Sequence, residues 1–191
     1  MEAALGPGYK TVLKRGAAGA AGGDPVPKTP IVLTARAADF ADYVVRKAID
    51  DERPIDNLQL QNILYLIQEH YVRLGRLAFG DIIEAWGFGP AVPNVYYRYG
   101  SVYGAMPIYY ASGKESRLHL ASEDKRFVDA VTERVSSMES PAVAAIIRRN
   151  SAWQQVFNGG KGYQKEIPIE LIRTAGGGAM PLICAYKRRK L

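Results

Sequence analysis

Apolar residues recur every three or four positions between residues 57 and 74, which is the spacing of one face of a helix. Asp56 stands where an N-cap is expected, and Gln59 three residues later completes a variant of the capping box. Gly75 suits the position just after a helix C-terminus. The segment therefore predicts an amphipathic helix whose buried face holds Leu60, Ile63, Leu64, Ile67, Tyr71 and Leu74.

The same spacing appears before and after this segment. Thr34 is a good N-cap for a helix that Pro54 stops, with a buried face made of Ala37, Phe40, Ala41, Val44 and Ala48. Shorter helices are expected after residues that favour helix starts: Pro93 to Tyr99 with Gly100 at its end, Ser122 onward, Ser140 to Arg149, and Pro168 to Arg173. The chain is thus predicted to be mainly helical.

A few short stretches favour extended backbone. Residues 82–86 are apolar and flanked by glycines, which indicates a strand or a buried extended segment, and residues 87–90 are expected to turn. Residues 107–111 and 117–120 are expected to pair as a hairpin. The predicted fold class is mainly α: a compact helical domain with a short β-hairpin or extended segments, a flexible N-terminal leader and a basic C-terminal tail.

Glycine and proline divide the chain into three parts. Residues 16–30 are rich in Gly, Ala and Pro and hold too little apolar area to offset the entropy lost on ordering. Residues 1–33 are therefore predicted to be a flexible leader and linker, and residues 34–175 the folded domain. The glycines at 176–178 mark a break, so residues 176–191 are expected to form a Gly-rich break and a basic tail.

Charge is concentrated at the ends of the chain. The formal net charge is +6, yet the acidic and basic residues between 29 and 186 are equal in number. Residues 187–190 are all basic and are interpreted as a solvated tail, with weak nucleic-acid contact as the alternative. A single cysteine, Cys184, excludes an internal disulfide and suits a reducing cytoplasm. No apolar run approaches the roughly 20 residues of a membrane-spanning helix.

The sequence shows no set of catalytic or metal-binding residues. His70 and His119 fall in different predicted elements, and neither has a His, Cys or Asp at ligand spacing. There is no phosphate-binding glycine loop, no dinucleotide fingerprint and no nucleophile elbow. We therefore expect no enzyme activity, no cofactor and no metal, with an enzyme whose groups assemble from distant positions as the alternative.

Six tyrosines and Arg98 lie between residues 96 and 110. One helix cannot bury Tyr96, Tyr97 and Tyr99 on a single face, so some rings are expected to reach the surface. Rings that cover a small core with solvated hydroxyls are the competing interpretation, and base stacking on nucleic acid is a third. Tyr and Arg are enriched at interface hot spots, which makes the partner-binding candidates Tyr97, Arg98, Tyr99 and Tyr103.

Three blocks of residues point to a known family. They are Asp-Asn-Leu-Gln-Leu-Gln-Asn-Ile-Leu-Tyr at 56–65, Glu-Ala-Trp-Gly-Phe-Gly-Pro-Ala-Val-Pro-Asn-Val-Tyr at 84–96, and Ser-Ala-Trp at 151–153. Their order and spacing resemble the Panacea domain family, which includes SocA-like antitoxins and phage-associated proteins of the GepA type. The resemblance covers residues 35–174, and the second block is its most specific part.

The resemblance implies an antitoxin that neutralises a cognate toxin by direct binding and, in the SocA manner, presents the toxin to a cellular protease. The alternative is a phage regulatory protein that binds nucleic acid through its basic ends. Glu84 is expected to need a partner, either an arginine or the start of the helix at Pro93. The family-signature residues are expected to form a scaffold and not an active site: Leu60, Gln61, Leu64, Tyr65, Glu84, Trp86, Gly89, Pro90, Pro93, Tyr96 and Trp153.

Overall fold

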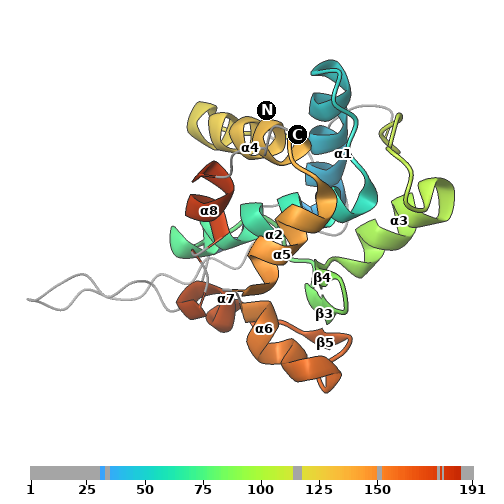
Figure 1. The fold of residues 1–191 in the computed structure, drawn as a ribbon. Helices are drawn as coiled ribbons and strands as arrows, with labels where there is room; N and C mark the ends of the chain where they lie inside the picture. Colours follow the sequence, from blue (N-terminus) through green and yellow to red (C-terminus); the bar gives the residue numbers. More distant parts are fainter. Residues whose placement is uncertain are drawn as a thin grey trace, which may run out of the picture.

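The computed structural model describes residues 31–32, 35–113, 118–149, 152–175, 177 and 179–185. Within these ranges the chain forms eight α-helices and a few short strands, so the mainly α fold class is confirmed (Figure 1). Residues 1–30 of the predicted leader, the predicted cap Thr34 and the basic residues 187–190 lie outside the described residues. No helix in the described part of the chain is long and apolar enough to cross a bilayer.

Helix α2 (Asn57–Arg73) is the centre of the fold (Figure 1). Five helices pack on it: α1 (Ala37–Asp50), α3 (Pro93–Tyr103), α4 (Ser122–Ser136), α5 (Ser140–Arg149) and α7 (Ile169–Ala175). The body is completed by α6 (Ala152–Phe157), a 3₁₀ turn at Asn158–Gly160 and α8 (Ala179–Ala185).

The capping box predicted at the start of α2 is present. Asp56 accepts a hydrogen bond from the Gln59 backbone N–H at 2.8 Å, and the Gln59 side chain accepts one from the Asp56 N–H at 3.0 Å. The predicted buried face is only part of what is buried, because almost every residue from Asn57 to Val72 is enclosed. Leu74, expected on that face, follows the helix and is 55% exposed. The segment is therefore a central helix surrounded by protein.

A three-stranded antiparallel sheet packs beside α2, in the order β4-β3-β5. Strands β3 (Glu84–Trp86) and β4 (Gly89–Ala91) form a hairpin, and β5 (Lys165–Glu166) pairs with the other edge of β3. Gly89 has a φ of 143°, a conformation that favours glycine. The expected turn is thus shorter than predicted, since Gly89 and Pro90 already belong to β4.

The hairpin predicted for residues 107–111 and 117–120 is wrong, because the described residues there form no strand. Ile108 is buried, and its backbone N–H donates to the carbonyl of Ile55 at 2.9 Å. The apolar residues of this segment therefore cover the loop before α2 and do not pair with one another.

Three predicted boundaries differ in the structure. Residues assigned to the leader form β1 (Ile31–Val32), which pairs in parallel with β2 (Arg76–Leu77). Helix α1 begins at Ala37 with Arg36 as its N-cap, and Asp39 accepts the Arg36 backbone N–H at 3.0 Å. Helix α3 runs through Gly100 and ends at Gly104, which has a φ of 57°.

The region predicted as a Gly-rich break and tail contains helix α8. Ala179 and Ile183, one helical turn apart, are buried, and α8 packs on α4 and α5. The Arg134 guanidinium on α4 donates to the carbonyl of Ile183 at 2.8 Å and so satisfies an end of this helix. This helix was not predicted, because seven residues are too few to show a clear helical period in the sequence and the preceding glycines favour a break. Cys184 is exposed on it.

Candidate protein-interaction surface

Four aromatic rings gather around Trp86, and we name these five residues the Trp86 cluster: Trp86, Phe88, Tyr96, Tyr97 and Tyr163. The Trp86 ring centroid lies 4.9 Å from that of Tyr96, 5.5 Å from Phe88, 5.7 Å from Tyr97 and 6.5 Å from Tyr163. Phe88 and Tyr96 stack at 5.3 Å. Trp86 is only 5% exposed, whereas Tyr97 and Tyr163 are 58% and 53% exposed. The cluster therefore joins a buried anchor to two rings on the surface.

Separate elements hold this cluster together. Trp86 ends β3, Phe88 lies in the hairpin turn, and Tyr96 and Tyr97 come from the first half of α3. The indole N–H of Trp153 on α6 donates to the Trp86 carbonyl at 2.8 Å, and Trp153 stacks on Phe157 at 4.6 Å. Signature residues Trp86 and Trp153 are thus linked directly, although they are far apart in sequence.

Glu84 has a partner that the sequence did not predict. Its Oε2 accepts a hydrogen bond from the Trp86 indole N–H at 2.8 Å. Neither of the expected partners, an arginine or the start of α3, takes this role. The reason is local: residues two apart on a strand face the same side of the sheet, so Glu84 and Trp86 are neighbours.

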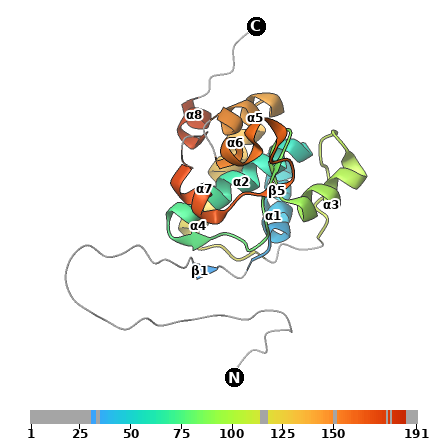
Figure 2. The ribbon, with the colours of Figure 1, turned by 90° about the horizontal axis from the view of Figure 1, so that it is seen from below.

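Helix α3 is attached to the body along a narrow face. Of its residues only Val95 and Tyr99 are buried. Its start is held by α2, because the Gln61 side-chain oxygen accepts the Val92 backbone N–H at 2.8 Å and the Asn57 amide donates to the Tyr96 carbonyl at 3.0 Å. Pro93 occupies the first turn, as predicted. Figure 2 shows α3 at the edge of the body.

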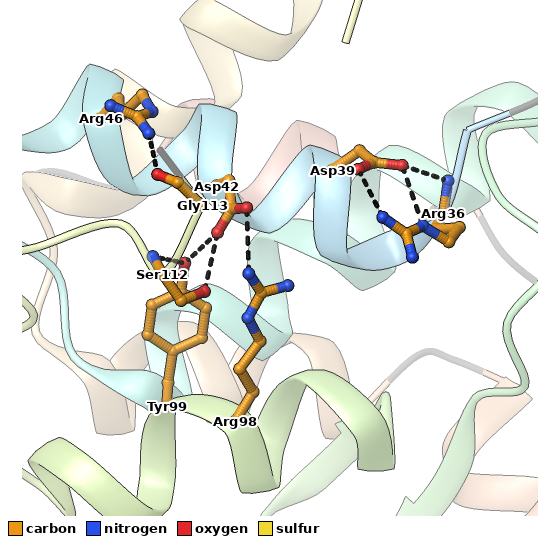
Figure 3. Close-up of polar contacts among 8 residues, drawn as sticks. All are labelled: Arg36, Asp39, Asp42, Arg46, Arg98, Tyr99, Ser112 and Gly113. Carbon is orange, nitrogen blue, oxygen red and sulfur yellow. Dashed lines mark hydrogen bonds and ion pairs between the residues drawn. The ribbon is translucent and has the colours of Figure 1, made fainter. Parts of the chain in front are cut away.

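A buried carboxylate fixes the second half of α3 (Figure 3). Asp42 on α1 is 6% exposed and accepts hydrogen bonds from the hydroxyls of Tyr99 at 2.7 Å and Ser112 at 2.9 Å. Its other oxygen pairs with Arg98 at 3.3 Å. We name these four residues the Asp42 network: Asp42, Arg98, Tyr99 and Ser112. Arg46 adds a hydrogen bond to the carbonyl of Gly113 beside it.

The structure corrects one partner-binding candidate and changes the interpretation of another. Tyr99 is 1% exposed and cannot contact a partner of the folded protein. Burial is the main cause that raises its pKa to about 12, and the hydrogen bond to Asp42 acts in the same direction. Arg98 is half-buried because its guanidinium pairs with Asp42. Tyr97 is exposed and Tyr103 is half-buried, so both remain candidates.

The segment from Tyr97 on α3 through the coil after this helix carries several exposed apolar side chains. We name these side chains the α3 ridge, and each of them is more than half exposed: Tyr97 58%, Val102 73%, Met106 67%, Tyr109 55% and Tyr110 77%. Exposed apolar side chains that gather on one segment commonly mark a contact surface. Val102 and Met106 were not indicated by the sequence, because the apolar residues of this stretch follow no helical period.

Most of the other signature residues are buried or half-buried. Leu60, Gln61, Leu64 and Tyr65 are enclosed on α2. Gly89 and Pro90 are buried in β4, and Tyr96 is half-buried. The scaffold role of these residues remains a prediction.

The described residues contain no cluster of side chains that could hold a metal ion. No group of three or more His, Cys, Asp or Glu side chains comes together among them. His70 stacks on Phe127 with ring centroids 3.6 Å apart, and burial lowers its pKa. His119 is exposed on a coil elsewhere. Both fit the structural interpretation of the histidines, which stays a prediction.

The comparisons with known proteins give one partial likeness. A stretch of 73 residues is 38% identical to Antitoxin SocA from Caulobacter vibrioides (strain NA1000 / CB15N). The match covers 38% of this chain and 38% of that protein's length. No family model matches the chain, and no solved structure matches it. The chain is therefore similar in part to an antitoxin.

Proposed function

We propose that this protein is an antitoxin that neutralises a cognate toxin by binding it directly through the α3 ridge and the exposed rings of the Trp86 cluster. The likeness to Antitoxin SocA supports the antitoxin role in general. The observation that carries the binding role is the α3 ridge, five large apolar side chains more than half exposed on α3 and the coil that follows it. The chain then acts by recognition and not by catalysis.

The chemistry of this surface favours a protein partner over a nucleic acid. Residues 87–113 contain a single charged side chain, Arg98, and it pairs with Asp42. Nucleic-acid surfaces draw most of their affinity from basic side chains on phosphates. A surface of tyrosine, valine and methionine without free charge resembles the centre of a protein interface, where charged residues are depleted and aromatic residues and methionine are enriched.

The way α3 is held also fits an interface. Gln61 and Asn57 fix its start and Asp42 fixes its second half, so the ridge is ordered before a partner arrives. A surface that is already ordered loses less entropy on binding. Delivery of the bound toxin to a protease is a further step of this proposal and requires a second surface.

The direct test is co-expression with the toxic product of an adjacent gene. The full chain is expected to restore growth and to co-purify with the toxin. Val102→Asp and Met106→Asp place a charge on the ridge and are expected to abolish both effects. Leu74→Asp is the matched control, because Leu74 is an exposed apolar residue at the end of α2. Rescue by all three variants would exclude the ridge, and no rescue by the parent chain would exclude the antitoxin role.

A further inference from the structure

The sheet next to α3 carries two acidic side chains at directly paired positions. Glu84 on β3 and Glu166 on β5 are register partners in the antiparallel ladder. Side chains at paired positions lie on the same face of a sheet, and like charges placed there repel. Neither carboxylate forms an ion pair with a residue in the described part of the chain. The neighbouring Lys165 alternates to the other face of β5.

Aromatic rings lie beside the Glu84 carboxylate. Glu84 accepts the indole N–H of Trp86, and Trp86 contacts both Tyr97 and Tyr163, each more than half exposed. The faces of aromatic rings attract a cation, and Trp and Tyr are the strongest of the natural side chains in this respect. The same sheet face thus combines negative charge with ring surface, and both favour a positively charged group.

The backbone conformation of the loop that carries Tyr163 is strongly constrained. Asn158 and Gln164 have positive φ angles of 42° and 59°, which non-glycine residues seldom adopt. The Gln164 N–H donates to the Ala85 carbonyl at 2.8 Å. A side chain on Gly162 would meet the Val156 carbonyl oxygen at 1.8 Å, so only glycine fits there. Such strained, over-determined backbone is typical of functional segments.

We propose that this face, formed by Glu84, Glu166, Trp86, Tyr97 and Tyr163, receives an arginine or lysine side chain of the protein that binds the α3 ridge. The identification of that protein as a toxin rests on the proposed function. The basic side chain lies against the rings of Tyr97 and Tyr163 and forms an ion pair with the two carboxylates. This ion pair removes the repulsion between the two carboxylates.

The first arm of the test needs no toxin. The full chain is titrated with a tetra-arginine peptide while the two indole N–H resonances are followed by NMR. The Trp86 resonance is expected to shift, because its N–H is bonded to Glu84, and the Trp153 resonance serves as an internal reference, because its N–H is bonded to a backbone carbonyl. Tetra-glutamine peptide is the control. An unshifted Trp86 resonance would overturn the proposal.

The second arm compares variants against the purified toxin. The double variant Glu84→Gln/Glu166→Gln keeps the acceptor for Trp86 and is expected to raise the Kd about tenfold and to reduce its salt dependence. Glu123→Gln/Glu133→Gln on α4 makes the same charge change at exposed positions, and Figure 1 places α4 far from β3 and β5. Equal Kd values for the two double variants would overturn the proposal even though the toxin binds.

Further variants test the role of the Tyr163 ring and identify which basic group occupies the site. Tyr163→Phe keeps the ring and is expected to retain the peptide shift, while Tyr163→Leu loses it. A Trp86 shift with peptide but no binding of any toxin would leave this site standing and exclude the antitoxin role. A Trp86 shift caused by deletion of residues 187–191 alone would identify the chain's own basic end as the occupant and overturn the assignment to a partner.

Discussion

The carboxylate of Asp42 on α1 accepts a hydrogen bond from the hydroxyl of Tyr99 on α3 at an oxygen–oxygen distance of 2.7 Å, and both residues are buried. This bond joins the central body to a helix that has only one other fully buried residue, Val95. The position of the exposed ridge therefore depends on a polar contact made on its hidden side. A surface helix held in this way can be tested without touching the surface itself.

Tyr99→Phe is expected to lower the free energy of unfolding by about 1–3 kcal/mol, because it leaves the buried Asp42 short of one donor while the ring still packs. Chemical denaturation measures this change. Amide hydrogen exchange is expected to accelerate in residues 99–113 more than in α2, since α3 loses an anchor. Tyr110→Phe removes the same hydroxyl from a ring that is 77% exposed and is expected to change neither quantity.

If amide hydrogen exchange in Tyr99→Phe accelerated equally throughout the chain, the hydrogen bond between Asp42 and Tyr99 would contribute only to global stability and not to the placement of α3.

The bond between the two tryptophans yields a second prediction. Trp86→Ala is expected to destabilise the protein by roughly 3–5 kcal/mol, because a ring that is 5% exposed leaves a cavity among its aromatic neighbours. Trp153→Phe keeps most of the ring but removes the donor to the Trp86 carbonyl, and about 1–3 kcal/mol is expected. Thermal melts with denaturant titrations measure both. An unchanged melting temperature for Trp86→Ala with lost toxin binding would make Trp86 a contact residue.

The sequence was sufficient to predict the helical class and the buried apolar residues of α2, because period and capping are local signals. It did not show that α2 is central. An amphipathic helix is expected to place its polar residues in solvent, whereas Gln61 and Gln68 are buried and form hydrogen bonds with backbone groups of other segments. Gln68 accepts the Ala78 N–H at 3.0 Å and donates to the Phe79 carbonyl at 3.1 Å. These hydrogen bonds depend on which segments pack against α2, and the spacing of residues in the sequence does not contain that information.

The candidate surface was also predicted only in part from the sequence. The crowding of tyrosines correctly indicated that some rings must be exposed, since a helix has only one inner face. The rotation of α3 about its own axis decides which tyrosines are exposed. The hydrogen bond between Asp42 and Tyr99 sets that rotation, because it turns Tyr99 toward the body. Tyr163 was missed, because it is a single ring in a glycine-rich loop and reaches Trp86 only through the pairing of β5 with β3.

A third prediction concerns pH and Glu69 on α2. Glu69 is 2% exposed, its carboxylate accepts the Gly177 N–H, and burial raises its pKa above 4.5 despite that bond and the nearby Arg73. Above pH 4.5 the unfolded chain releases this proton before the folded chain does. The contribution of Glu69 to stability is therefore largest at low pH and falls as pH rises through the window from 4.5 up to the raised pKa.

Glu69→Gln does not titrate and still offers an oxygen to Gly177. The stability of this variant relative to the parent chain is expected to increase with pH across that window and then level off. Denaturant titrations between about pH 4 and pH 8 measure the difference, with the exposed Glu170→Gln as the control. A difference that is constant with pH would mean that Glu69 titrates at its ordinary value in the folded protein.

The last prediction separates contact from support on α3. Tyr97 is 58% exposed and its ring contacts those of Trp86 and Tyr96, whereas Arg98 pairs with the buried Asp42. Tyr97→Ala is expected to leave the melting temperature nearly unchanged and to weaken toxin binding by about 2 kcal/mol, near a thirtyfold rise in Kd. Arg98→Ala is expected to weaken binding as well, but together with faster hydrogen exchange in α3, because it removes an anchor of the helix.

Tyr97→Phe is the matched control and is expected to bind like the parent chain, since the ring supplies most of the contact area. Calorimetric titration with purified toxin gives the affinities, and growth rescue at equal expression gives the effect in cells. If Tyr97→Ala binds as tightly as Tyr97→Phe while Val102→Asp does not bind, the toxin contacts the far end of the ridge. In that case the Trp86 cluster supports α3 from below and lies outside the interface.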